Sequence, residues 1–112
     1  MNILIVADAL ELFKIYKDTT FSMMREAQRR GHKLAACEPQ HLGWQRGRPV
    51  TATVREIVLT GDKNEWFRVE ATREVPLREY DAVLMRKDPP FDAEYIYATH
   101  LLEQAEREGA KV

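Results

Sequence analysis

The sequence predicts an α/β domain whose sheet is mostly parallel, with flanking helices and an inserted antiparallel β-hairpin. Two unbroken apolar runs, residues 3–7 and 82–85, are typical of short strands that are buried on both faces of a parallel sheet. A helical pattern follows each run, as in the alternating strands and helices of α/β proteins. Between them, residues 41–77 lose the helical period and alternate instead, which predicts the hairpin.

The first predicted unit consists of a strand, a loop and a helix. The strand covers residues 3–7, and residues 8–18 have no clean period, so we expect a loop at the carboxyl end of this strand. Thr19 or Thr20 then caps a helix over residues 21–30, because a threonine oxygen accepts hydrogen bonds from the first free N–H groups of a helix.

A glycine and a second apolar run complete this unit. Gly31 ends the helix, and residues 34–37 form the next strand. Strand, helix and strand in this order predict a right-handed βαβ unit. Cys37 lies in the apolar run, so we interpret it as an inert core thiol rather than a reactive one.

The middle of the chain predicts the inserted hairpin. Residues 50–59 alternate as one extended strand, with a bulge expected near residues 55–56. After a glycine turn, residues 66–69 begin the second strand. We interpret Trp44 and Trp66 as packing anchors of this hairpin rather than as platforms for a ligand.

The last predicted unit joins a strand to a helix through a charged proline turn. The strand, residues 82–85, ends at Arg86, and two consecutive prolines then exclude both a further ladder bond and an immediate helix. Asp92 is suited to cap the final helix, about residues 92–108, which Gly109 terminates.

The chain of 112 residues is long enough for one domain with a single core. Its last residues, 110–112, resemble the opening of another strand. We therefore expect it to be a fragment of a longer protein.

Composition excludes several functional classes. The formal net charge is -1 and apolar residues make up 45% of the chain, so neither a disordered chain nor a nucleic-acid-binding surface is indicated. There is no signal peptide, and no apolar run approaches the roughly 20 residues that span a bilayer. We expect a soluble, cytoplasmic protein without nucleic-acid or membrane partners, and the single cysteine fits a reducing compartment.

Familiar catalytic motifs are missing from the sequence. No glycine-rich dinucleotide fingerprint follows the first strand, and there is no P-loop. His32, His41 and His100 lack metal-ligand spacing, and we interpret them as surface or packing residues. No nucleophile elbow is present. We therefore predict no catalytic residue and no metal ligand in this stretch.

A recognition site is still predicted at the carboxyl ends of the strands, where open α/β sheets bind ligands. The free N–H groups at the start of a helix suit a carboxylate, and an arginine offers a planar fork for another. The structural alternative is that Arg86 and Asp88 pair with each other or with Asp8 and only tie down the turn. The candidate substrate-binding residues are Asp8, Asp18, Thr19, Thr20, Arg86 and Asp88.

Several motifs closely resemble the N-terminal part of bacterial glutathione synthetase. The most specific are MRKDPPFD at residues 85–92 and YIYAT at residues 95–99. KDTTF at residues 17–21, EAQRRGH at residues 26–32 and EWF at residues 65–67 support them. The resemblance covers the whole chain.

The resemblance implies a Rossmann-like pre-ATP-grasp domain, residues 1–112, of an ATP-grasp ligase. Such an enzyme joins γ-glutamylcysteine to glycine through an acyl phosphate, uses ATP and magnesium, and is a homo-oligomer. ATP and magnesium would be held by the ATP-grasp region, which is absent here, so the chain alone would be inactive.

The resemblance also places the candidate residues in the wall that faces the peptide substrate. Arg86 would grip a substrate carboxylate, and Thr19 and Thr20 with the helix N-terminus would orient it. Asp88 would fix Arg86 or receive an amino group. Two other classes stay open from the residues alone: a free-standing, flavodoxin-like ligand-binding module, and an oligomerisation unit.

Overall fold

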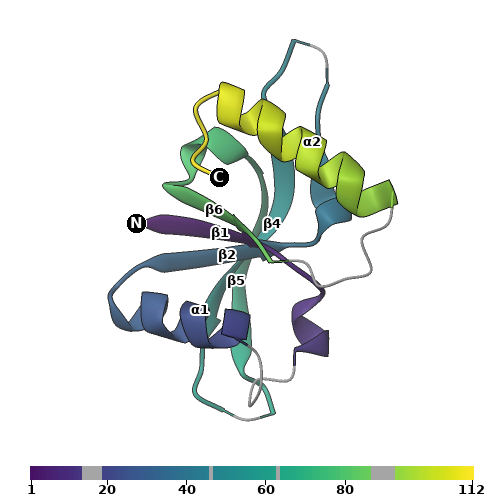
Figure 1. The fold of residues 1–112 in the computed structure, drawn as a ribbon. Helices are drawn as coiled ribbons and strands as arrows, with labels where there is room; N and C mark the ends of the chain where they lie inside the picture. Colours follow the sequence, from purple (N-terminus) through teal and green to yellow (C-terminus); the bar gives the residue numbers. More distant parts are fainter. Residues whose placement is uncertain (14–18, 46, 63, 87–92) are drawn as a thin grey trace.

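The computed structural model describes residues 1–13, 19–45, 47–62, 64–86 and 93–112. Within these residues a six-stranded sheet lies between two α-helices, so the predicted α/β class is confirmed (Figure 1). The strands are β1 (Asn2–Val6), β2 (Lys33–Cys37), β3 (Leu42–Gly43), β4 (Thr51–Leu59), β5 (Phe67–Pro76) and β6 (Ala82–Met85). The helices are α1 (Thr19–Arg29) and α2 (Ala93–Arg107), with short 3-10 turns η1 (Leu10–Leu12), η2 (Pro39–His41) and η3 (Leu77–Glu79).

Three parallel strands form one half of the sheet. β1 lies between β2 and β6, and Leu4 is level with Ala35 on one side and Val83 on the other. Leu4 has no exposed surface, as expected for a central strand covered on both faces. Burying a leucine side chain contributes roughly 1.5–3 kcal/mol. β1, α1 and β2 form the predicted βαβ unit.

An antiparallel half continues the sheet beyond β2. β4 pairs antiparallel with β2 through Leu34 and Ile57, and its opposite edge pairs with β5 along its full length, which confirms the predicted hairpin. The two-residue β3 pairs with the beginning of β4. The sheet is therefore mixed, and the prediction of a mostly parallel sheet is not confirmed. The inserted hairpin pairs directly with β2, so its antiparallel strands belong to the same sheet as the parallel ones.

A bulge in β5 changes which face its side chains occupy. Glu56 is level with Ala71 but Ile57 is level with Val69, so Glu70 is the extra residue. The predicted bulge position is close to this level of the ladder, but the extra residue is on β5 rather than β4. The apolar residues of β4 lie on both faces of the sheet: Val54 packs on the α2 side and Ile57 on the α1 side.

Helix α1 begins at Thr19, two residues before the predicted start. Thr19 and Thr20 are therefore inside its first turn, and the prediction that one of them is the cap is wrong. Met24 on its inner face is buried, and the helix ends before Gly31, which has a φ of 86°. This left-handed backbone angle is one that glycine adopts without steric cost.

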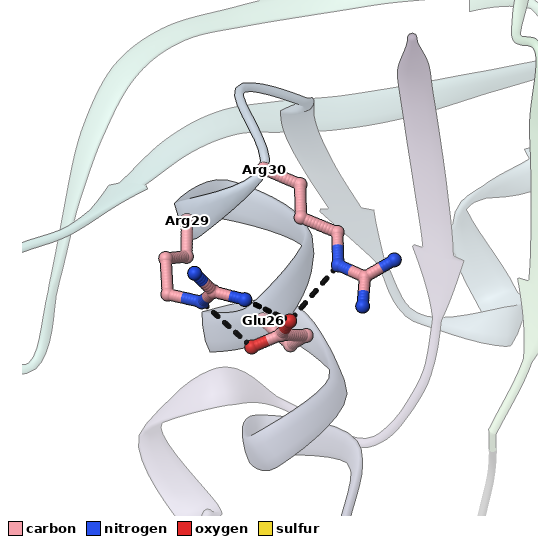
Figure 2. A network of polar contacts seen from close by, with 3 residues as sticks. All are labelled: Glu26, Arg29 and Arg30. Carbon is pink, nitrogen blue, oxygen red and sulfur yellow. Dashed lines mark hydrogen bonds and ion pairs between the residues drawn. The ribbon is translucent and has the colours of Figure 1, made fainter.

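Figure 2 shows an exposed network in the last turns of α1, where Glu26 lies between Arg29 and Arg30. Its carboxylate oxygen Oε1 is 2.6 Å from Nη2 of Arg29 and 2.9 Å from Nε of Arg30. Hydrogen bonds from Arg29 and then from Arg30 lower the pKa of Glu26 to about 2. The network stays ionised at neutral pH.

Helix α2 covers the opposite face of the sheet. It ends at Arg107, followed by Gly109 with a φ of 107°, as predicted; the predicted cap Asp92 lies outside the described residues. Beyond it, the N–H of Val83 donates to the carbonyl of Lys111 at 2.7 Å, so the chain runs beside β6. Neither helix in the described part of the chain is long and apolar enough to cross a membrane.

Each helix packs on its own apolar cluster because successive residues of β1 point to opposite faces. Leu4 and Val6 belong to the α2 side, whereas Ile3 and Ile5 belong to the α1 side. From α2 the first cluster takes Ala98, Leu101, Leu102 and Ala105. The second takes Met24, Phe21 and Ala27 from α1 and adds Leu10, Phe13, Trp66 and Phe67.

The two tryptophans differ in their environment. Trp66 is 6% exposed and packs in the α1-side cluster, which confirms it as a packing anchor. Trp44 is 47% exposed, so the same interpretation is wrong for Trp44. It follows the short strand β3, and about half of its surface is exposed.

Candidate functional site

The carboxyl ends of the parallel strands meet at one edge of the sheet. There the N–H of Ala7 donates to the carbonyl of Cys37 at 3.0 Å, and the N–H of Arg86 donates to the carbonyl of Val6 at 2.7 Å. The ladder therefore continues to the last residue of each strand. Asp8 and Arg86 emerge from neighbouring strands at the same edge, as the sequence predicted.

Arg86 contacts the beginning of α1 through its side chain. Its Nε donates to Oγ1 of Thr20 at 3.3 Å, and its Nη2 donates to Oγ1 of Thr19 at 3.3 Å. Thr20 is 6% exposed, whereas Thr19 and Arg86 are exposed. The structure thus brings together three of the six predicted site residues, which lie more than 60 positions apart in sequence.

Arg86 and these two threonines form a corner between the end of β6 and the start of α1, and two of its features favour an anion. Both threonines lie in the first turn of α1, at the end where the helix dipole is positive. The Arg86 guanidinium adds a full charge. A helix N-terminus and a guanidinium together suit a carboxylate or another planar anion.

Asp8 lines a small cavity at the ends of β1 and β2. The cavity has a volume of about 200 Å³, below the usual range for drug-sized ligands and near the size of an amino acid. Its polar lining includes Glu38, His41 and Arg55. Nδ1 of His41 accepts a hydrogen bond from the N–H of Glu38 at 3.0 Å, so this histidine caps a turn, as expected for a structural role.

A larger hollow, about 1020 Å³, lies near the amino ends of β1 and β2, where Asn2 and Lys33 line it. The Tyr80 hydroxyl beside it is buried and has no hydrogen-bond partner among the described residues, and burial raises the pKa of Tyr80 to about 12. We assign the candidate site to the carboxyl edge all the same, because that edge holds the charged cluster where α/β sheets bind ligands.

Cys37 is a core residue, as predicted. It is 6% exposed, and burial, with a smaller effect of Glu38, raises the pKa of its thiol to about 12. The thiolate is the nucleophilic form, so this side chain is inert at neutral pH. Within the described ranges, no group of three or more histidine, cysteine or acidic side chains is placed to hold a metal ion.

An aromatic cluster beside α1 was not predicted. Phe13 stacks on Trp66 with ring centroids 5.5 Å apart, and Phe21 meets the same ring edge-on at 5.3 Å. Phe67 adds a third contact to Trp66 at 4.7 Å. Phe13 falls in the aperiodic loop, so the only sequence signal was an aromatic residue on each side of the 14–18 segment.

Two of the predicted site residues, Asp18 and Asp88, lie outside the described residues, as does the charged proline turn at residues 87–92. Asp8 and Arg86 share the edge, and Arg86, Thr19 and Thr20 are in contact. The described geometry therefore contains one assembled corner, formed by the end of β6 and the start of α1.

Comparison with known proteins matches the whole chain. The family model described as prokaryotic glutathione synthetase, N-terminal domain, matches residues 1–112. A glutathione synthetase from Ralstonia nicotianae is 51% identical over 112 residues, which are all of this chain and 34% of that relative. Relatives of the same name from Nitrosomonas europaea and Vibrio parahaemolyticus are 46% and 45% identical, over 100% and 96% of this chain and 36% and 34% of their own lengths. The chain thus spans about a third of these relatives, and it belongs to the family of prokaryotic glutathione synthetase N-terminal domains.

Proposed function

We propose that this chain is the substrate-side domain of a glutathione synthetase, a ligase that joins γ-glutamylcysteine to glycine. The family match over the full chain and the glutathione synthetases among its relatives support this proposal. Because the chain spans about a third of those relatives, we propose that the catalytic reaction needs the remainder and that this chain alone is inactive.

The single observation that carries the site proposal is the contact of Arg86 with Thr19 and Thr20. Two hydroxyl groups from one helical turn accept hydrogen bonds from the guanidinium at the helix N-terminus. We propose that this corner binds a carboxylate of γ-glutamylcysteine by charge-assisted hydrogen bonds. Asp88 would fix Arg86 or receive the amino group of the substrate, and Asp8 and Asp18 would complete the wall.

In this proposal the corner contributes by binding and orientation. Holding one carboxylate of the dipeptide fixes where its reacting carboxylate lies, so binding energy far from the reacting atoms lowers the entropy cost of reaction. The reacting carboxylate would be activated as an acyl phosphate by ATP. The amine of glycine would then attack the acyl carbon, and phosphate would leave.

ATP and magnesium would be bound outside this chain. We propose that an ATP-grasp region supplies both, that the present fold serves as its Rossmann-like pre-ATP-grasp domain, and that the enzyme is a cytoplasmic homo-oligomer. Magnesium would neutralise phosphate charge in that region. No residue of this chain is proposed as a metal ligand.

A chimera tests the proposal directly. This chain would replace the N-terminal third of the Ralstonia relative, and ATP-dependent glutathione formation and calorimetric binding of γ-glutamylcysteine would be measured. We expect activity in the chimera, no turnover by the 112-residue chain, and weakening of dipeptide binding by Arg86→Ala of about 10- to 150-fold, the loss of a charged hydrogen bond.

Arg78→Ala provides the matched control. Arg78 is also exposed, but it lies in η3 before β6 rather than after it. If Arg86→Ala left the binding of γ-glutamylcysteine unchanged, the arginine would only stabilise the turn after β6. Tight dipeptide binding by the 112-residue chain alone would instead favour a free-standing module.

A further inference from the structure

One ring from the hairpin holds both sides of the loop between β1 and α1. Trp66, just before β5, stacks on Phe13 with an interplanar angle of 19° and meets Phe21 at 88°. Phe13 precedes residues 14–18, and Phe21 is in the first turns of α1. Both flanks of the loop are therefore packed against a side chain that comes from a different part of the chain.

A charged contact ties the same loop to the same hairpin. Nη2 and Nη1 of Arg55 on β4 donate to the two carboxylate oxygens of Glu11 in η1 at 3.0 and 3.2 Å. The hydrogen bond from Arg55 lowers the pKa of Glu11. The Arg55 guanidinium also lies 5.5 Å from the ring centroid of Phe67, which in turn packs on Trp66. The rings and the ion pair form one connected contact between hairpin and loop.

This contact ends at the candidate site. Phe21 directly follows Thr20, the buried hydroxyl to which Nε of Arg86 donates. Both Arg86 bonds, 3.3 Å long, end on hydroxyl groups of the first turn of α1, so a displacement of this turn would move both acceptors away from Arg86. The position of the first turn of α1 therefore decides whether the corner exists.

We propose that Trp66 is a positioning residue for the dipeptide site and that the inserted hairpin braces the Arg86 corner. The inference rests on the proposed function, because the corner has to bind substrate for its position to matter. The hairpin would then serve the site at a distance, through the aromatic contacts of Trp66 with Phe13 and Phe21.

Kinetics of the chimera test the brace. We expect Trp66→Leu to raise KM for γ-glutamylcysteine about tenfold while KM for ATP changes less than about twofold, because misplaced binding groups weaken only the ligand they hold. Trp66→Phe keeps a ring and should restore most of the affinity. Trp44→Leu is the matched control, since Trp44 is 47% exposed and follows β3, outside the β4–β5 hairpin, and it should leave all constants unchanged.

A double-mutant cycle with Arg86→Ala shows whether the brace acts through the corner. If it does, Trp66→Leu has little further effect once Arg86 is gone. An equal effect in both backgrounds, or a parallel rise of both KM values, would refute the brace and leave the proposed function standing. Failure of the unmutated chimera to make glutathione would count against the proposed function, and the brace would fall with it.

Discussion

The two halves of the sheet bury their side chains to different extents. In the parallel half, four of the five residues of β1 and four of the five of β2 are buried. In the antiparallel half, β5 buries only Val75 of its ten residues and carries Arg68, Glu70, Arg73 and Glu74 on its length. β1 and β2 therefore supply a larger share of their residues to the core than β5 does.

This difference separates stability from positioning. The corner that we propose as the site is formed at the end of the parallel half, by β6 and α1. Among the described residues, the hairpin contacts the loop and helix that flank this corner through Trp66, Arg55 and Leu59. Mutations of the buried side chains of β1 and β2 should therefore cost more stability than mutations of the exposed side chains of β5.

The largest effect is expected in the centre of β1. Leu4→Ala removes a side chain with no exposed surface and leaves a cavity in the apolar cluster on the α2 side of the sheet, so we expect a loss of about 2–5 kcal/mol of unfolding free energy in urea titrations. Val69→Ala on β5 removes a side chain that is 40% exposed and should change stability by less than about 0.5 kcal/mol. Similar losses would show that both halves share one core.

Alkaline pH should weaken the parallel half through Cys37. Its folded pKa is raised from 9.0 to about 12, so the folded state keeps the proton that the unfolded state releases. The stabilisation is complete below pH 9 and is lost as pH rises toward 12, about 2 kcal/mol between pH 9 and 11. Cys37→Ala should flatten this slope in urea titrations at each pH, apart from a contribution of Tyr80, whose pKa is also raised. An unchanged slope would contradict the assignment to Cys37.

A smaller loss is expected where α1 holds the hairpin. The side-chain amide of Gln28 donates to the carbonyl of Leu59 at 3.0 Å and accepts from its N–H at 2.7 Å, so it replaces a neighbouring strand at the end of β4. Gln28→Ala leaves both backbone groups unpaired and should cost about 1–2 kcal/mol by urea denaturation. Gln40→Ala, at an exposed position, is the control. Equal stability of the two variants would show that water replaces the amide.

The smallest effect is expected for the exposed network of Figure 2. Glu26→Gln removes the charge that pairs with Arg29 and Arg30, but solvent and salt screen such exposed pairs. Because the pKa of Glu26 is lowered to about 2, any stabilisation is present above pH 4.5 and is lost as pH falls through 2. Thermal melts at low and high salt should differ only slightly between variant and parent at pH 7. A large difference in melting temperature that does not depend on salt would show that the network contributes to stability.

Sequence predicted the parallel half better than its partner for a physical reason. Unbroken apolar runs such as residues 3–7 have one stable environment, a strand covered on both faces, so their role follows from local pattern. Alternation in residues 50–59 identified a strand but not its partners, and the pairing of Ile57 with Leu34 depends on tertiary packing. The mixed sheet was missed for that reason.

The candidate site also has a part that the sequence predicted and a part that it did not. The rule that parallel strands end at one edge placed Arg86 near Thr19 and Thr20, and the structure shows this contact. The aromatic contact between Phe13 and Trp66 joins residues with no shared pattern. A loop without a period and the end of a hairpin contain no signal that one will pack on the other, so only the folded chain reveals it.

The single extra residue in β5 also limits how the length of this chain can vary among relatives. Phe67 and Val75 are an even number of positions apart, yet they pack on opposite sides of the sheet, because Glu70 reverses the parity between them. Deleting Glu70, or inserting one residue beside it, would exchange the apolar and charged sides of half the strand. Natural insertions and deletions should therefore gather in the connection between β4 and β5, where they leave that parity intact.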